Sequence, residues 1–134
     1  MKYTVFSDGA ARGNPGPAGA GFVVYDVSGK EVGSRAIALG NTTNNVAEYT
    51  ALIEAVKFVE TLKPESVDFF LDSELVVNQI AGRYKVKTEH LKPLYAKLVG
   101  LLAGMNATVR HVRREANKVA DALANKGADK NENS

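Results

Sequence analysis

The sequence predicts an α/β protein with one five-stranded mixed sheet, in which three antiparallel strands are followed by parallel strands, flanked by helices. Three observations predict this class: strand-like segments open the chain, a long helical pattern follows them, and strand and helix patterns then alternate to the end. The chain has 134 residues, 45% of them apolar, which is enough for one hydrophobic core and too little for two.

The first third of the chain predicts an antiparallel meander. Three segments are typical of strands, and we expect strands over residues 2–8, 22–25 and 31–39. Residues 9–21 hold five glycines and two prolines and are expected to begin as an irregular loop. A turn over residues 27–30 joins the second strand to the third.

Helices and strands alternate over the rest of the chain. A helix is expected from the polar stretch 41–45 to about Leu62, because apolar residues recur at helical spacing and Pro64 stops the pattern. The other expected elements are a strand over 67–71, a helix over 73–81 capped by Ser73, a helix over 89–102, a strand over 107–112 and a helix over 117–126. Residues 1–127 would form the domain, and residues 128–134 a polar, disordered tail.

Two carboxylates end strands that the topology makes neighbours. The connection between the first and fourth strands is long enough for a parallel crossover, so Asp8 and Asp72 are expected side by side at the carboxyl edge of the sheet. Glu48 lies on the apolar stripe of the crossover helix and therefore faces inward. Asp121, in the last helix, could complete the group.

The four acids together predict a metal site. Each acid alone has an ordinary structural explanation, such as capping a turn or favouring a helix N-terminus. As a group they would repel one another and could not all ionise without a counter-charge. A hard divalent cation supplies that charge, and oxygen ligands without His or Cys favour Mg²⁺ or Mn²⁺ over Zn²⁺.

The composition excludes several classes of protein. The chain has no cysteine, which excludes disulfides, zinc fingers and cysteine nucleophiles. It has no run of about 20 apolar residues and no signal-like start, so we expect a cytoplasmic protein without a membrane span. Basic residues concentrate in segments 83–97 and 110–118, which indicates either a polyanionic partner or solvated faces.

Five blocks of sequence, in order, resemble the type 1 ribonuclease H family over residues 1 to about 127. The blocks are FSDGAARGNPGPAGAG, TTNNVAEYTAL, FFLDSELVVNQIAG, YKVK and HVRREANKVADALAN. The resemblance implies a five-stranded mixed sheet with flanking helices. It also implies a monomeric enzyme that hydrolyses the RNA strand of RNA·DNA hybrids with two Mg²⁺ ions, or Mn²⁺ in their place, leaving 5′-phosphate and 3′-hydroxyl ends.

The same resemblance implies roles for five catalytic residues. Asp8 would bridge both ions, and Asp121 would help to hold the ion that activates water. Glu48 and Asp72 would hold the ion beside the leaving oxygen. Arg114 precedes a Glu-x-Asn stretch and, as in the compact archaeal and bacterial subgroup, would serve where other members use a flexible histidine. A surface phosphate contact or ion pair is an equal alternative for Arg114.

Substrate contacts are implied for two segments that match the family's substrate-binding loops. Gly13 and Asn14 lie in the first segment, and Asn44 and Asn45 in the second. Small groups that both donate and accept hydrogen bonds suit a ribose 2′-hydroxyl in a shallow minor groove. The same residue types are also favoured in turns and caps without a ligand.

The chain departs from the family pattern in three places. Many members carry a longer basic protrusion with tryptophan that grips the DNA strand; this chain has no Trp, so Lys85 and Lys87 are expected to form a reduced phosphate contact. Glu74 replaces a common Gln near the substrate and would repel phosphates unless it points away. His111 falls within the last expected strand and is interpreted as a strand residue rather than as the flexible histidine.

Two other functions stay open on the sequence alone. One is a nuclease of the same fold that also cuts double-stranded RNA or branched DNA. The other is a non-catalytic hybrid-binding module, which dispersed carboxylates would favour. A phosphate-binding nucleotide loop is disfavoured, because residues 13–19 lack a Gly-Lys-Ser/Thr step and are not followed by a helix.

Overall fold

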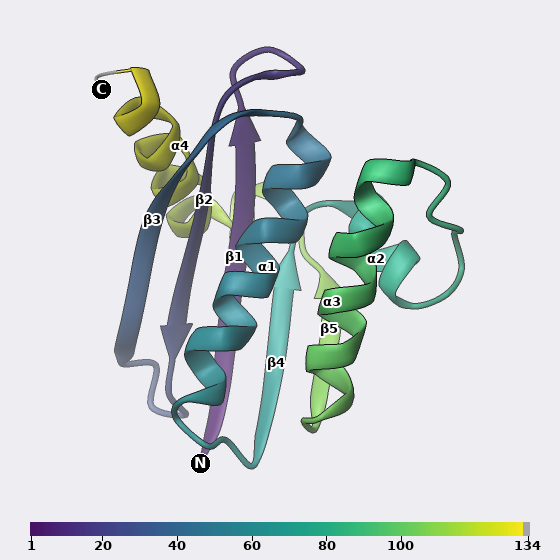
Figure 1. The fold of residues 1–134 in the computed structure, drawn as a ribbon. Coiled ribbons are helices and arrows are strands. Elements are labelled where there is room, and N and C mark those ends of the chain that lie inside the picture. Colours follow the sequence, from purple (N-terminus) through teal and green to yellow (C-terminus); the bar gives the residue numbers. More distant parts are fainter. Residues whose placement is uncertain (133–134) are drawn as a thin grey trace.

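The computed structural model describes residues 1–132 and contains a five-stranded mixed sheet with the strand order β3-β2-β1-β4-β5 (Figure 1). The antiparallel part comprises β1 (Lys2–Ala11), β2 (Gly16–Tyr25) and β3 (Glu31–Thr42). β4 (Ser66–Leu71) pairs in parallel with β1, and β5 (Ala107–His111) pairs in parallel with β4. The predicted fold class is therefore confirmed.

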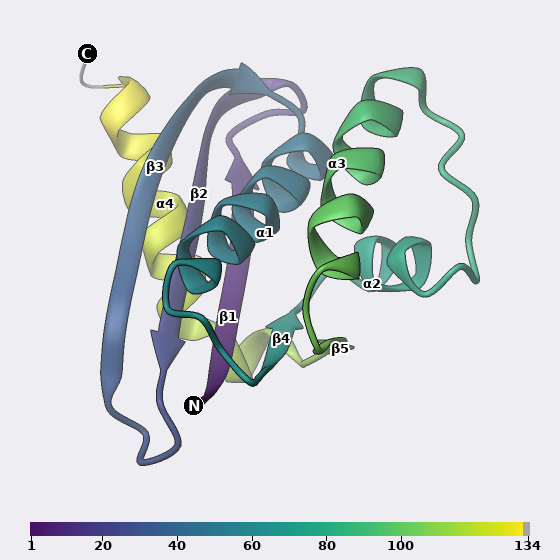
Figure 2. The same cartoon turned by 60° about the horizontal axis from the view of Figure 1, so that its bottom comes forward.

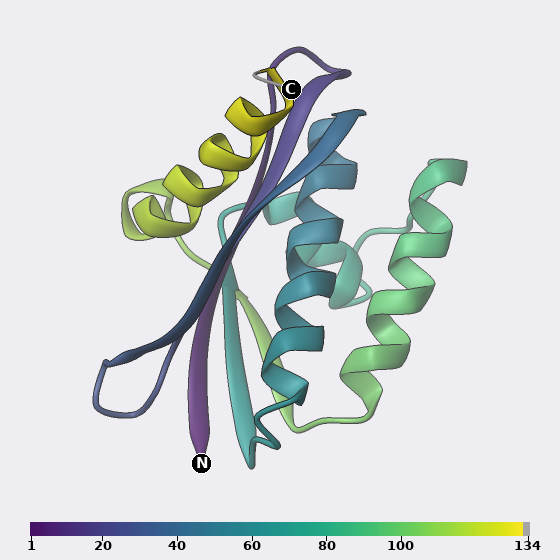
Figure 3. The same cartoon turned by 60° about the vertical axis from the view of Figure 1, so that its left-hand side comes forward.

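Helices cover both faces of this sheet. They are α1 (Asn44–Glu60), α2 (Glu74–Ile80), α3 (Lys92–Ala103) and α4 (Lys118–Glu132), with short 3₁₀ turns η1 (Glu89–Leu91) and η2 (Arg114–Ala116). α1 and α3 lie on one face and α4 on the other (Figure 3), while α2 lies beside β5 (Figure 2). None of the helices in residues 1–132 has the length of apolar sequence that a membrane span requires.

Local sequence signals explain where the helices begin. The side chain of Thr43 accepts a hydrogen bond from the backbone N–H of Val46 at the start of α1, at 3.3 Å. Ser73 accepts one from the N–H of Val76 at the start of α2, also at 3.3 Å, which confirms the predicted cap. Pro93 lies in the first turn of α3, where its missing N–H costs no hydrogen bond.

The main core lies between the sheet and α1. Its largest fully buried side chains include Phe22 and Phe69 from the sheet and Tyr49 and Leu52 from α1. The other face of the sheet is covered by α4 through small residues, because Ala120, Ala124 and Ala128 are all fully buried. Because these side chains are small, α4 lies close to the backbone of β2.

The predicted loop over residues 9–21 is wrong for most of its length, because β1 and β2 continue through it and only residues 12–15 connect them. The glycines there permit close packing rather than breaking the strands. A Cβ on Gly19 or Gly21 would overlap the backbone of α4, and a Cβ on Gly9 would overlap the backbone of α1 at Ala47 and Glu48.

The predicted disordered tail over residues 128–134 is also wrong for residues 128–132, which form the last turns of α4. Ala128 is fully buried, and the Asn131 side chain donates to the carbonyl of Ala18 and accepts from the N–H of Gly40 at 3.0 Å. The polar composition hid these specific contacts. Residues 133–134 of that prediction lie outside the described residues.

Candidate active site

Two aspartates lie side by side at the carboxyl edge of the two central strands. Ser7 of β1 is the register partner of Leu71, the last residue of β4, so Asp8 and Asp72 are the next residues along the two neighbouring segments. Asp8 is almost fully buried, and Asp72 is half-buried. Their predicted juxtaposition is confirmed.

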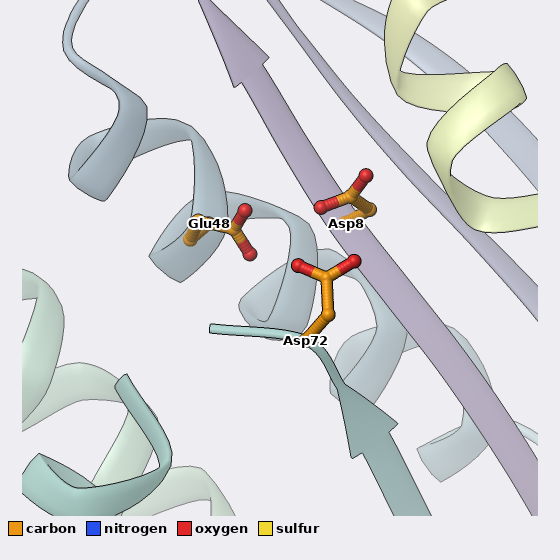
Figure 4. A group of neighbouring side chains, drawn as sticks. All are labelled: Asp8, Glu48 and Asp72. Atoms are coloured by element: carbon orange, nitrogen blue, oxygen red, sulfur yellow. The ribbon is translucent and has the colours of Figure 1, made fainter. Parts of the chain in front are cut away.

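Glu48 joins them from α1, which packs over this edge. Its side chain is 8% exposed, and one oxygen from each of Asp8, Glu48 and Asp72 lies within 4.8 Å of the others (Figure 4). Asp8 comes from strand β1, Glu48 from helix α1 and Asp72 from the position directly after strand β4, and the three carboxylates point toward one another (Figure 4). Their convergence requires α1 to lie close to β1, which the missing side chain of Gly9 allows.

Asp121 approaches from α4, on the opposite face of the sheet. It lies outside the three-acid group but lines the same cavity of about 320 Å³. Three of the four predicted acids therefore form a close group, and the fourth, Asp121, lies beside Asp8.

Burial makes this group of acids electrostatically unfavourable. The pKa of Asp8 is raised from 3.8 to about 7, chiefly by burial and also by the charges of Asp72 and Asp121, against a hydrogen bond with Glu48 that lowers it. Burial, and next the Asp8 charge, raise the pKa of Glu48 well above its usual 4.5. Among the described residues, nothing hydrogen-bonds to the buried Oε2 of Glu48.

These features fit a hard divalent cation. The converging ligand atoms of Asp8, Glu48 and Asp72 are all carboxylate oxygens, and they include no imidazole or thiolate. A cation there would offset the repulsion that raises the pKa values and would give Glu48 Oε2 a partner. The chemistry of the donor set thus suits Mg²⁺ or Mn²⁺.

Two asparagines that the sequence analysis did not identify orient the acids. Asn117, only 1% exposed, donates from Nδ2 to Asp72 Oδ2 at 3.1 Å and to the Ser7 carbonyl at 2.9 Å. Asn125 donates to the carbonyl of Asp121 at 2.9 Å and to its Oδ1 at 3.4 Å. Asn125 follows Asp121 by one helical turn, and this spacing could have indicated their contact from the sequence. The contact of Asn117 depends on tertiary structure.

Two further predicted residues, Arg114 and Asn44, line the acidic cavity. Asn44 Oδ1 accepts from the N–H of Ala11 at 2.8 Å, and the Asn44 N–H donates to Asn14 Oδ1 at 3.1 Å. These bonds join the β1–β2 connection to the start of α1. Gly13, in the same connection, is exposed and has a φ of 96°.

The other predicted contact residues do not line the acidic cavity. Asn45 is half-buried in the first turn of α1 and does not line the acidic cavity. Lys85 lines a separate cavity beside α3, and Lys87 is exposed on the connection between α2 and α3. Glu74 is exposed and points toward His111, with 3.9 Å between Glu74 Oε1 and His111 Nε2. His111 is the last residue of β5, as expected of a strand residue.

Comparisons with known proteins cover nearly the whole chain. A family described as reverse transcriptase-like matches residues 6–127. The chain is 40% identical to the bifunctional protein Rv2228c of Mycobacterium tuberculosis over 96% of its own length. The crystal structure of RNase H1 from Halobacterium salinarum is similar with a TM-score of 0.93 and 35% identity, covering 97% of this chain and 99% of that one. LC11-RNase H1, solved in complex with an RNA/DNA hybrid, is similar with a TM-score of 0.90 and 40% identity, covering 96% and 97%.

The sheet order and these similarities define the ribonuclease H class of α/β fold. The chain belongs to the ribonuclease H family, in its compact type 1 group, which confirms the resemblance seen in the sequence. It spans 36% of the length of the mycobacterial relative and 63% of the length of Halobacterium ribonuclease HI.

Proposed function

We propose that this protein is an endonuclease that hydrolyses the RNA strand of RNA·DNA hybrids with two divalent cations, leaving 5′-phosphate and 3′-hydroxyl ends. The observation that carries this proposal is the convergence of Asp8, Glu48 and Asp72 within 4.8 Å, with Asp121 in the same cavity. The solved complex of the similar LC11-RNase H1 with an RNA/DNA hybrid supports the substrate class.

The chain's own residues divide into ligands and supports. Asp8 has the central place, because Glu48, Asp72 and Asp121 all influence its pKa. It would therefore hold both cations. Glu48 and Asp72 would hold one cation with it, and Asp121 the other. Divalent cations bound there supply Lewis-acid chemistry, activating the attacking water and stabilising charge on the leaving oxygen.

Neighbouring residues would orient the substrate and the ligands. Asn117 fixes the carboxylate of Asp72 and Asn125 that of Asp121, so both acids are preorganised. Arg114, at the rim of the cavity, would contact a backbone phosphate or assist release of the product. Asn14 and Asn44, held to one another, would read 2′-hydroxyl groups of the RNA strand.

Product analysis on defined substrates tests this function. A labelled RNA·DNA hybrid should be cut inside its RNA strand in Mg²⁺ or Mn²⁺ and should stay intact with chelator. RNA duplex and branched DNA of the same sequence serve as parallel substrates, and efficient cleavage of either would widen the proposed specificity. Binding of the hybrid without cleavage in any divalent metal would favour the binding-module alternative. The preference for Mg²⁺, the monomeric state and a cytoplasmic location stay predictions.

A further inference from the structure

A second polar cavity, of about 450 Å³, lies between α2 and β5, and the proposed function does not use it. Its basic lining residues are Arg83, Arg110 and His111, and its acidic one is Glu74. The basic residues come from two distant parts of the sequence, the turn after α2 and the end of β5. We refer to this cavity as the α2–β5 groove.

The α2–β5 groove adjoins the acidic site along the same edge of the sheet. His111 is the register partner of Leu71, the residue before Asp72, and Glu74 follows Asp72 by two residues. Neighbouring strands lie about 4.8 Å apart, so the groove begins about one strand from the acids. Asn14 and Asn44 lie on the other side of Asp8, toward β2.

The guanidinium groups of the groove have N–H donors available to bind a ligand. Arg83 Nη1 donates to Asn78 Oδ1 at 3.2 Å, which places the guanidinium and leaves its other N–H groups available. Arg110 is exposed, and within residues 1–132 its side chain makes no hydrogen bond or ion pair. The two arginines outweigh the single charge of Glu74, which itself lies beside His111. Such planar donors bind phosphate and carboxylate oxygens bidentately, and phosphate is the anion that a nucleic-acid backbone presents.

We propose that the α2–β5 groove binds a backbone phosphate of the RNA strand, a short distance along that strand from the linkage held at the acids. This inference rests on the proposed function, and it assigns Arg83 and Arg110 as substrate-binding residues. The RNA strand is the one that the acids must hold, and the groove continues the edge on which they lie. The contact offsets the repulsion between the acidic cavity and the substrate backbone.

Alanine variants separate this contact from a general charge effect. The double variant Arg83→Ala/Arg110→Ala should raise KM for hybrid cleavage about tenfold and leave kcat unchanged, because one charge-assisted phosphate contact is lost. The slope of log KM against log salt should fall by about one. Arg35→Ala is the matched control: Arg35 is exposed on β3, at the opposite edge of the sheet, and its loss should change neither quantity.

Glu74→Gln should lower KM about threefold, since it removes an opposing charge.

Neutral linkages identify the strand. Single methylphosphonates are placed at successive positions of the RNA strand or of the DNA strand, and hybrid binding is measured by fluorescence anisotropy with Asp8→Asn protein. One RNA-strand position should weaken binding about tenfold with intact arginines and should have no further effect in the Arg83/Arg110 double variant. The proposal would be overturned if the methylphosphonates and the arginine substitutions weakened binding additively at every RNA position. It would also be overturned if a methylphosphonate lost its effect in the double variant only on the DNA strand.

The binding assay also separates failure of this inference from failure of the proposed function. If the hybrid is bound but not cut, the proposed activity fails while the groove is still tested by its effect on affinity. If cleavage is normal and the double variant behaves like Arg35→Ala, only the groove proposal fails. A hybrid that does not bind to the Asp8→Asn protein at all would overturn the groove proposal directly.

Discussion

Asp8 is the residue on which the acidic site depends, because it lies in contact range of the other three acids and is itself almost fully buried. Its carboxylate is isosteric with an amide, which keeps the shape of the cavity and removes the charge. Asp8→Asn should therefore reduce cleavage of an RNA·DNA hybrid to background in Mg²⁺ or Mn²⁺. Gel analysis of end-labelled RNA measures this. Retention of full activity would exclude a metal mechanism centred on Asp8.

Asn117 is a second residue with an expected effect on both stability and activity. Asn117→Ala leaves the Ser7 carbonyl and Asp72 Oδ2 without their donor, which should cost about 1–3 kcal/mol of unfolding free energy. Cleavage should also weaken, since Asp72 loses its orientation. Thermal unfolding and steady-state kinetics give the two numbers. Asn41→Ala, at an exposed position of β3, is the control and should leave both near wild type.

At the scale of single elements, the sequence predicted which strands and helices exist better than it predicted their ends. The alternation in β1 and the cap at Ser73 are local signals, and both elements form where expected. The strand through Gly19 and Gly21 was missed because glycine usually interrupts strands. Here glycine is selected by contact with α4, a helix that lies about 100 residues further along the chain. Such contacts leave no local pattern.

The crossing of α4 over β2 gives an element-scale prediction. Gly21→Ala places a Cβ against Ala124 and Leu123 and should destabilise the protein by about 2–3 kcal/mol, because neither backbone can move away without cost. Gly100→Ala is a matched control with the opposite sign. Gly100 lies in α3 with open space around it, so alanine should stabilise by about 0.5–1 kcal/mol. Urea unfolding of both variants measures these values, and equal effects would refute the packing explanation.

At the scale of the whole molecule, four elements meet at the site from three layers. β1 and β4 bring Asp8 and Asp72 together through parallel pairing, which the order of predicted elements already required. α1 adds Glu48 from one face, and α4 adds Asp121 from the other. The sequence could therefore place the trio, since each acid follows from a topology rule. The supporting contact of Asn117 depends on the exact packing of η2 and α4, which no rule of spacing predicts.

The buried acids make the stability of the whole molecule depend on pH. The pKa of Asp8 is raised from 3.8 to about 7, so below about pH 4 its carboxyl is protonated in both the folded and the unfolded state. Between about pH 4 and 7 the unfolded chain ionises first, and the free energy of unfolding falls as pH rises. Relative to wild type, metal-free Asp8→Asn should therefore gain on the order of 2–4 kcal/mol over this range. Chemical denaturation of both proteins in chelator measures the difference, and a constant difference would contradict this account.

Divalent cations should reverse this destabilisation. Binding to the folded state alone raises the unfolding midpoint with ligand concentration, and the carboxylates bind only when deprotonated. The increase in Tm with Mn²⁺ should thus be larger at about pH 8 than at about pH 5. Asp8→Asn should abolish most of it. Calorimetry with and without metal checks this, and an equal increase in the variant would place the binding site elsewhere.

The hydrogen bonds of Asn131 have a practical consequence for anyone who shortens this protein. The region that matches the family ends at residue 127, which makes that position an attractive place to cut. The side chain that ties the helix end to Ala18 and Gly40, and the Lys130 ammonium that donates to the Ala36 carbonyl, both lie beyond it. A minimal version for crystallography or fusion should keep the chain through Glu132, so that β2 and β3 retain these hydrogen bonds to α4.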